Sequence, residues 1–234
     1  MNGIIIRVSG RWAQFRKPET NNTPLTHDFI TKTAMIGLVG AVLGVERGPM
    51  RALFPQLCED LLYGVLIRGV VKKQSWAFTL RNAHKPNDPA EKAPRQMEFI
   101  RDPDYYVALA LRGERSSGVF QQFADAVQNC KACFTPVLGL HNCPAELEWL
   151  HTGEFLARQE TYQTKGFALR THTLVGKIEP RLRVGFERIP TYQDDNWWNR
   201  PDGYREVVYP SAGTELQVSG EHFVFSTGEA WCLI

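Results

Sequence analysis

The chain alternates apolar and polar side chains at its start and then changes to a helical spacing of apolar and small residues. Between residues 4 and 15, Ile4, Ile6 and Val8 share one side of an extended chain, which predicts a β-strand. Residues 29–45 form an apolar stretch in which glycines recur at helical spacing. Because a glycine weakens a helix by ~1 kcal/mol relative to alanine, this pattern predicts a core helix whose glycine face is approached closely by another backbone.

The same patterns predict the elements that follow. The expected ranges are 50–62 and 116–130 for helices, 65–80 and 97–111 for long strands, and 147–156, 167–177, 181–189, 204–208, 216–218 and 223–225 for short strands. Gly48-Pro49 is expected to break the chain between the first two helices. The order of elements favours a split βαβ unit with an antiparallel sheet, which is an α+β fold.

The segment 81–95 interrupts the two long strands. It contains three prolines and almost no apolar side chains. Such a segment is not expected to form a core strand, so it is predicted to project as an arm between the strands. A surface loop is the alternative interpretation.

The charge of the chain is divided unevenly. The net formal charge is only +2, but residues 1–97 carry 14 Lys/Arg against 7 Asp/Glu and residues 98–234 carry 13 against 18. A basic part joined to an acidic part is typical of a protein that binds a polyanion on one side and protein partners on the other, although unused surface charge is the alternative. Within the acidic part, Trp197 and Trp198 are predicted either to contact a partner or to pack back onto the protein.

Membrane and secretory signals are not expected in this sequence. The apolar run at residues 4–6 is too short for a signal peptide. The apolar helix at 29–45 is shorter than the ~20 residues that cross a bilayer. The five cysteines are an odd number, which favours free thiols in a reducing compartment. We therefore expect a cytoplasmic protein with no membrane partner.

Basic and aromatic side chains interleave where the first strand ends and the first long helix begins. They are Arg11, Trp12, Phe15, Arg16, Lys17 and Lys32. The polar connector at residues 16–27 lies between the end of the strand and Lys32. Single-stranded nucleic acid is held in this way, because cations bind phosphates and rings stack on bases. The helix start, which Thr31 or Asp28 can cap, adds free N–H groups and the Thr33 hydroxyl. Core packing is the alternative for Trp12 and Phe15.

Two further groups of residues suggest chemistry. Cys130, Cys133, His141 and Cys143 have a spacing typical of a tetrahedral zinc site, but buried free thiols are the favoured interpretation, and we expect no metal or other cofactor. A metal-independent ribonuclease needs only a base and a cation, which His84 with Lys85, or Tyr105 with a lysine, can supply. The sequence has no P-loop, GxGxxG, GxSxG or HExxH motif.

Residues 10–44 resemble the amino-terminal signature of a known family. The matching features are GRWAQFR at the end of a strand, a polar loop, and then ITKTAMIGLVGAVLG. The arm at 81–95 and the stretch PVLGLHNCPA at 136–145 also look like that family. The chain therefore resembles the fifth Cas family, the RAMP-superfamily subunit of type I CRISPR effector complexes, and within it the non-cleaving type I-B-like branch.

The resemblance implies a fold and a function. Residues 1–145 would form a ferredoxin-like, RRM-like domain whose thumb lies near 81–95, and residues 146–234 would form a mostly antiparallel β region packed on it. The protein would be a non-catalytic subunit of a Cascade surveillance complex. It would cap the 5′ handle of the CRISPR RNA (crRNA), contact the large subunit and a backbone subunit, and lie near target DNA at the PAM. The alternative is a metal-independent endoribonuclease that processes precursor crRNA.

The resemblance also implies residues that contact RNA. By position, Arg11, Phe15, Arg16, Lys32 and Thr33 would line the handle; Lys85, Lys92 and Arg95 would belong to the thumb; and His141 and Asn142 follow a Leu-Gly turn near it. Trp12 and Lys17 join this set from the interleaving of rings and charges described above. No catalytic or metal-binding residue is expected.

Overall fold

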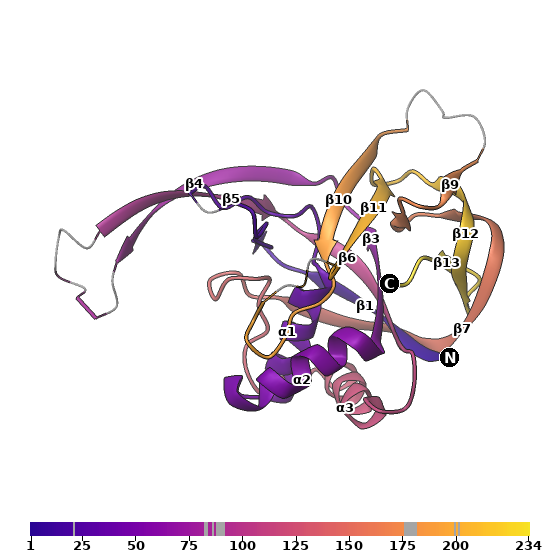
Figure 1. Cartoon of the computed structure of the whole chain (residues 1–234), viewed down its shortest axis with the longest axis horizontal. Coiled ribbons are helices and arrows are strands. Elements are labelled where there is room, and N and C mark those ends of the chain that lie inside the picture. Colours follow the sequence, from indigo (N-terminus) through magenta and orange to yellow (C-terminus); the bar gives the residue numbers. More distant parts are fainter. Residues whose placement is uncertain are drawn as a thin grey trace.

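The computed structural model describes all residues except 21, 82–83, 86, 88–91, 176–181, 199 and 201. Its largest sheet has seven strands, in the order β13-β12-β7-β1-β6-β3 with β9 paired to β12, and two smaller sheets have the orders β10-β11-β8 and β2-β5-β4. Every strand pair is antiparallel. This mixed architecture, with few helices and antiparallel sheets, confirms the predicted α+β class (Figure 1).

The centre of the large sheet is β1 (Asn2–Ser9), which pairs with β6 (Asp104–Leu111) and β7 (Glu146–Thr164). Ile4, Ile6 and Val8 belong to the main hydrophobic core, whereas Ile5 belongs to a second cluster. Since alternate residues of a strand face opposite sides of the sheet, the predicted alternation is confirmed, and both faces of the sheet are covered.

Three helices pack on the face of the sheet that carries the main core: α1 (Lys32–Leu43), α2 (Arg47–Asp60) and α3 (Ser117–Gln128). Thr31 caps α1 by accepting a hydrogen bond from the Ala34 N–H, as the sequence allowed, and Gly44 ends it with φ 72°. The helix is shorter than the predicted range 29–45. Its termini are set by this cap and by the left-handed conformation that glycine adopts easily.

The glycine positions of α1 that are closely approached face side chains. A Cβ on Gly40 would lie 2.8 Å from the Met50 sulfur, and one on Gly44 would meet the Cys133 side chain, while one on Gly37 would meet nothing within 4 Å. A second backbone does approach the end of this helix, because the N–H groups of Cys133 and Phe134 donate to the carbonyls of Val42 and Ala41 at 2.9 and 3.0 Å. Gly48-Pro49 lies inside α2 and does not break the chain, because a proline is tolerated in the first turn of a helix.

Each of the two predicted long strands is two strands that lie in different sheets. The range 65–80 contains β3 (Leu61–Ile67) and β4 (Lys72–Arg81), and the range 97–111 contains β5 (Lys92–Arg101) and β6. Residues 68–71 and 102–103 carry the chain between the sheets, and Asp102 there has φ 51°. Alternation continues through such a change of sheet, so the sequence pattern did not show it.

The arm comprises β4, β5 and the segment that joins them. The two strands pair from Lys72 opposite Arg101 to Arg81 opposite Lys92, and the short β2 (Trp12–Ala13) pairs with β5 at the base. Figure 1 shows the arm projecting from the body of the protein. An arm was predicted, but it already begins at Lys72, before the predicted range 81–95. Residues 82–83, 86 and 88–91 of that range lie outside the described part.

The carboxyl-terminal region extends the large sheet through β7. Residues up to Glu154 of this strand pair with β1, and residues from Phe155 pair with β12 (Leu216–Phe225). The predicted strands 216–218 and 223–225 are thus a single strand. The remaining strands are β8 (Ala168–Leu169), β9 (Thr173–Leu174), β10 (Val184–Pro190), β11 (Tyr204–Pro210) and β13 (Ala230–Trp231). The division into 1–145 and 146–234 stays a prediction.

Candidate nucleic-acid interface

A cleft of ≈ 550 Å³ lies where six segments of the chain converge. Its lining residues are Gln14, Phe15, Arg16, Pro18, Pro24, Thr31, Thr33, Ala34, Phe54, Arg95, Met97, Gly139, Leu140, Pro190 and Gln193. The segments are the end of β2 with the connector, the start of α1, the middle of α2, the arm strand β5, the turn at 139–140, and the end of β10. Apolar walls with a few amide, hydroxyl and guanidinium groups are typical of a ligand site.

Four of the predicted RNA-binding residues line this cleft: Phe15, Arg16, Thr33 and Arg95. They come from three segments of the chain, the connector after β2, the start of α1 and the arm strand β5, so their proximity depends on the fold. Arg16 forms an isolated β-bridge with Thr26, which folds the connector back on itself. Phe15 is only 3% exposed and packs against the Tyr105 ring at 6.4 Å. Its ring therefore serves mainly as a wall of the cleft and a part of the core.

The turn that follows α3 holds the AQFR segment in place. The Gln14 N–H donates to the Leu138 carbonyl at 3.0 Å. Gly139 has φ 92°, and a Cβ there would collide with the Gln14 carbonyl oxygen. The two stretches that resemble the known family therefore contact each other. His141 and Asn142 are exposed in the same turn but do not line the cleft.

Lys32 lies apart from the cleft, although its neighbours Thr31 and Thr33 line it. The Lys32 side chain belongs to the buried set at 3% exposure. Burial lowers its pKa to about 8; Cys58 opposes this shift, and the positive charges of Arg112 and Arg205 add to it. The role of Lys32 as a phosphate ligand stays a prediction, and this conformation offers RNA little of its ammonium group.

Aromatic rings follow one face of the arm. Trp12 and Trp76 make an edge contact at 5.0 Å, and Trp76 and Phe78 are stacked at 6.3 Å. Trp76 is 42% exposed. By strand register, the side chains on this face are Trp12, Lys72, Gln74, Trp76, Phe78, Arg95, Met97, Phe99 and Arg101. The face therefore combines rings with cations and carries no carboxylate among these described residues.

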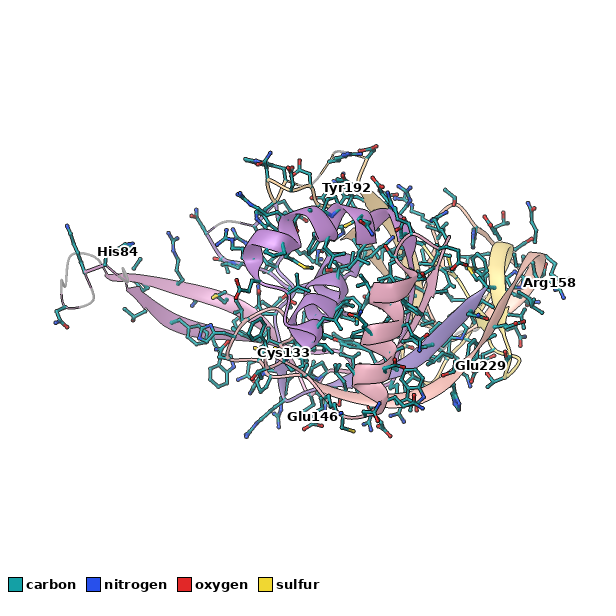
Figure 2. All side chains as sticks on the ribbon, turned by 90° about the horizontal axis from the view of Figure 1, so that it is seen from below. His84, Cys133, Glu146, Arg158, Tyr192 and Glu229 are labelled. Atoms are coloured by element: carbon teal, nitrogen blue, oxygen red, sulfur yellow. The ribbon has the colours of Figure 1, made fainter. Side chains whose placement is uncertain are left out.

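The remaining predicted residues are distributed over this region. Arg11 is exposed at the base of the arm. Lys17 forms an ion pair with Glu187 at 3.0 Å, so its charge is partly neutralised. Lys85 is exposed beside His84, which lies at the far end of the arm (Figure 2). Lys92 begins β5, and its side chain lies outside the described residues.

A polar network fixes the connector against the base of the arm. Lys73 of β4 contacts Asp28 at 2.6 Å, the Thr26 carbonyl at 2.9 Å and Glu98 at 3.3 Å. Burial opposes the charge of Lys73, but the hydrogen bond and ion pair with Asp28 outweigh it and raise the Lys73 pKa. Tyr209 of β11 donates its hydroxyl to the same Asp28 carboxylate. This network joins three parts of the chain beside the cleft.

The catalytic alternatives find limited support in this arrangement. Tyr105 is 1% exposed and donates its hydroxyl to the Asp28 carbonyl at 3.2 Å, and burial raises its pKa well above the usual value. A tyrosine held in this way is a poor general base. His84 and Lys85 are far from the cleft along the arm (Figure 2).

The predicted cysteine cluster is spread between surface and core. Cys130 and Cys133 are exposed and Cys143 is buried; the position of Cys133 beside the helices is seen in Figure 2. Burial raises the pKa of Cys143 to about 11. In the described ranges, no three His, Cys, Asp or Glu side chains are grouped so that they could hold a metal ion.

Among the residues of this interface that were absent from the predicted set are Gln14 and Trp76. Gln14 is a polar residue within an otherwise apolar strand end, and that mismatch was the available signal. Trp76 was visible in the sequence among the basic residues of the arm. The loop tryptophans divide between the two predicted roles, because Trp197 packs on Phe54 at 5.4 Å while Trp198 is 72% exposed. No helix of the described part is long and apolar enough to cross a bilayer.

The chain is similar in sequence to known CRISPR-associated proteins. A model of the family described as CRISPR-associated protein (Cas_Cas5) matches residues 3–206. The chain is 26% identical over 151 residues to the CRISPR system Cascade subunit CasD of Escherichia coli (strain K12), a match that covers 60% of this chain and 66%, slightly under two thirds, of that protein.

Two solved structures share the fold. A CRISPR protein from Archaeoglobus fulgidus is 13% identical with a TM-score of 0.62, and the similarity covers 99% of this chain and 98% of that one. A chain of a CRISPR RNA-guided surveillance complex is 17% identical with a TM-score of 0.54, covering 92% and 91% of the two chains. At these identities, the similarity concerns the fold.

Proposed function

The chain belongs to the Cas5 family of CRISPR-associated proteins, and from this premise we propose that it is a non-catalytic subunit of a Cascade surveillance complex that binds the 5′ handle of the crRNA. The family predicted from the sequence is thereby confirmed, while the type I-B-like branch stays a prediction. The similarity to CasD, which is named as a Cascade subunit, supports membership in such a complex.

The observation that carries the proposal is the composition of the cleft. Apolar walls such as Phe15 and Met97 lie beside the Thr33 hydroxyl and the arginines Arg16 and Arg95. Single-stranded RNA presents flat bases and charged phosphates together, so it needs apolar surface and cations at the same place. The start of α1 adds N–H groups and the positive end of the helix dipole, which favour a phosphate.

The arm extends the proposed RNA path. Its face of rings and cations continues from Arg95 and Met97, which line the cleft, to Trp76 and Phe78. Rings along such a path stack on bases without regard to sequence. Arg11, Trp12, Lys17, Lys32, Lys85, Lys92, His141 and Asn142 complete the proposed RNA-contacting set.

Partners are proposed for the other surfaces. The large subunit and a backbone subunit of the complex are expected to cover exposed apolar side chains, of which Trp198 and Phe134 are 72% and 48% exposed. Target DNA near the PAM is a further proposed contact. No cofactor is needed for a binding role, and the protein is proposed to act in the cytoplasm.

Co-purification tests the proposal. The chain is co-expressed with a CRISPR array and candidate effector subunits and then isolated, and the bound RNA is sequenced. We expect guides with uniform 5′ handles, and we expect recovery to fall for Arg16→Ala with Arg95→Ala. Arg158→Ala is the matched control, because Arg158 is an exposed arginine on β7 at the opposite end of the molecule from the arm (Figure 2).

The outcomes separate the proposed roles. Recovery of the chain without RNA and without other subunits would reject the proposal. Incubation of the pure chain with repeat RNA in EDTA tests the ribonuclease alternative, and we expect no discrete product. A discrete product that is lost on substitution of His84 would instead favour the enzyme.

A further inference from the structure

The side-chain amide nitrogen of Gln14, Nε2, is buried and has no hydrogen-bond partner, and Gln14 is only 2% exposed and lines the cleft. We propose that Gln14 reads the edge of an adenine base held in the cleft, an inference that rests on the proposed RNA-binding function. Gln14 would then be a residue that determines base specificity at one position of the bound strand.

A buried amide without a partner is uncommon in folded proteins. Buried polar groups are almost always satisfied, and an unsatisfied one weakens the folded state. The amide nitrogen of Gln14 finds no acceptor among the described residues. A group that the fold leaves unsatisfied next to a cleft is suited to a ligand that supplies the missing partner.

The backbone of Gln14 is fixed, which makes the amide a positioned group. Its N–H is bonded to the Leu138 carbonyl at 3.0 Å, and its carbonyl is packed against Gly139. Gln14 lies between Ala13 and Phe15, both of which are buried in the main core.

The surroundings fit a nucleobase. Phe15, Met97 and Leu140 supply apolar walls, against which the faces of a base pack. Arg16 and Arg95 supply charge for the flanking phosphates. A phosphate alone would not need the apolar walls, and an apolar group alone would leave the amide unsatisfied.

The choice of adenine follows from hydrogen-bonding chemistry. A glutamine amide offers one donor direction and one acceptor side by side, and adenine offers the complementary pair in its N6 amino group and an adjacent ring nitrogen. The corresponding major-groove edge of guanine offers two acceptors, which leaves the amide oxygen unpaired. Cytosine offers the same donor and acceptor as adenine, at N4 and N3, but it has a smaller ring face to pack against Phe15, Met97 and Leu140, so the larger purine is the base that we propose. An unstacked adenine in single-stranded RNA exposes the edge with N6 and N1 and the edge with N6 and N7, and either edge can make this contact.

The test uses the full-length chain and synthetic handle RNA of the sequence recovered with the complex. Each adenosine is replaced in turn by purine riboside, which lacks the N6 amino group, and dissociation constants are measured by competition. For the wild-type chain, we expect one replacement to weaken binding about tenfold, the effect of one lost contact of this kind. We expect Gln14→Met to bind the unmodified RNA about tenfold more weakly and to be insensitive to that replacement.

The control variant is Gln217→Met, since Gln217 is exposed on β12, and we expect it to match the wild type. If no single replacement weakens wild-type binding, the proposal is rejected whether or not Gln14→Met folds. If Gln14→Met keeps the wild-type profile, a bound water satisfies the amide and the proposal is also rejected. If the wild-type chain does not distinguish handle RNA from a scrambled sequence, the proposed function itself has failed.

Discussion

The imidazole Nδ1 of His27 lies 2.9 Å from the carboxylate of Glu187, and both side chains are almost fully buried. The contact joins the connector before α1 to β10, 160 residues later in the chain. Lys17 approaches the same carboxylate at 3.0 Å. Burial opposes ionisation of Glu187, but the hydrogen bonds from His27 and Lys17 outweigh it and hold the Glu187 pKa below its usual value.

This network predicts a pH-dependent stability. A lowered folded-state pKa stabilises the protein above the usual glutamate pKa of 4.5, and that contribution is lost as the pH falls through the folded-state value. Glu187→Gln should therefore lower the free energy of unfolding by ~2 kcal/mol at pH 7. The difference from the wild type, measured by urea unfolding, should shrink as the pH falls below 4.5. A difference that stays constant with pH would contradict this account.

Lys32 predicts a second rise of stability with pH, in the alkaline range. Its pKa is about 8 in the folded protein and 10.5 when unperturbed, so the unfolded chain binds more protons between these values and stability rises with pH across that window. Lys32→Met should remove this rise and should raise the free energy of unfolding at pH 7 by about 2–3 kcal/mol. Urea unfolding of both proteins between pH 7 and 10 measures the difference.

The same variant tests whether Lys32 contacts RNA. A phosphate beside the ammonium would favour its protonated form, so RNA binding by the wild type should weaken as the pH rises above about 8. Lys32→Met should bind more weakly at pH 7 and lose this dependence. Equal affinity of the two proteins at every pH would remove Lys32 from the RNA-binding set while leaving the stability prediction intact.

Trp76 is predicted to matter for RNA and little for stability. It is 42% exposed on the face of the arm that carries rings and cations. Trp76→Ala should weaken RNA binding by ~1–3 kcal/mol, the range for loss of one stacked base, with only a small change in melting temperature. Phe186→Ala is the control, because Phe186 is an aromatic residue 65% exposed on β10. Equal losses of affinity in the two variants would argue against a specific stacking site.

Gly139 is predicted to be intolerant of any side chain. Its φ of 92° disfavours other residues, and a Cβ would collide with the carbonyl of Gln14. Gly139→Ala should lower the free energy of unfolding by ~2 kcal/mol or more and should weaken RNA binding through displacement of Gln14. Gly118→Ala in α3 meets nothing within 4 Å, and because alanine favours helix, it should raise stability by up to ~1 kcal/mol. Thermal unfolding compares the two.

Local patterns predicted those parts of the fold that depend on neighbours in sequence. The alternation of Ile4, Ile6 and Val8 identified β1, although the predicted strand 4–15 also includes β2, which lies in another sheet. The apolar range that begins at residue 29 placed the start of α1 within three residues. The passage from β3 to β4 was missed, because an alternating strand looks the same in either sheet. What decides the sheet is the partner strand, and β6 and β5 come from a later part of the chain.

The site depended on distant contacts in the same way. The sequence brought Phe15, Arg16, Thr33 and Arg95 into one predicted set, and the fold brings them to one cleft. The burial of Lys32 was not predictable, because the groups near it come from α2 and β11. The unsatisfied amide of Gln14 was equally hidden, since it results from what the folded chain fails to place beside it.

The length of β7 limits how this protein can vary. One strand pairs with β1 as far as Glu154 and with β12 from Phe155 onward. A one-residue insertion or deletion at that junction would reverse the facing of every side chain on one side of it, turning buried Phe155 and Tyr162 outward. Relatives are therefore expected to keep the length of 146–164 constant, and inserted tags or labels belong in the surface loops.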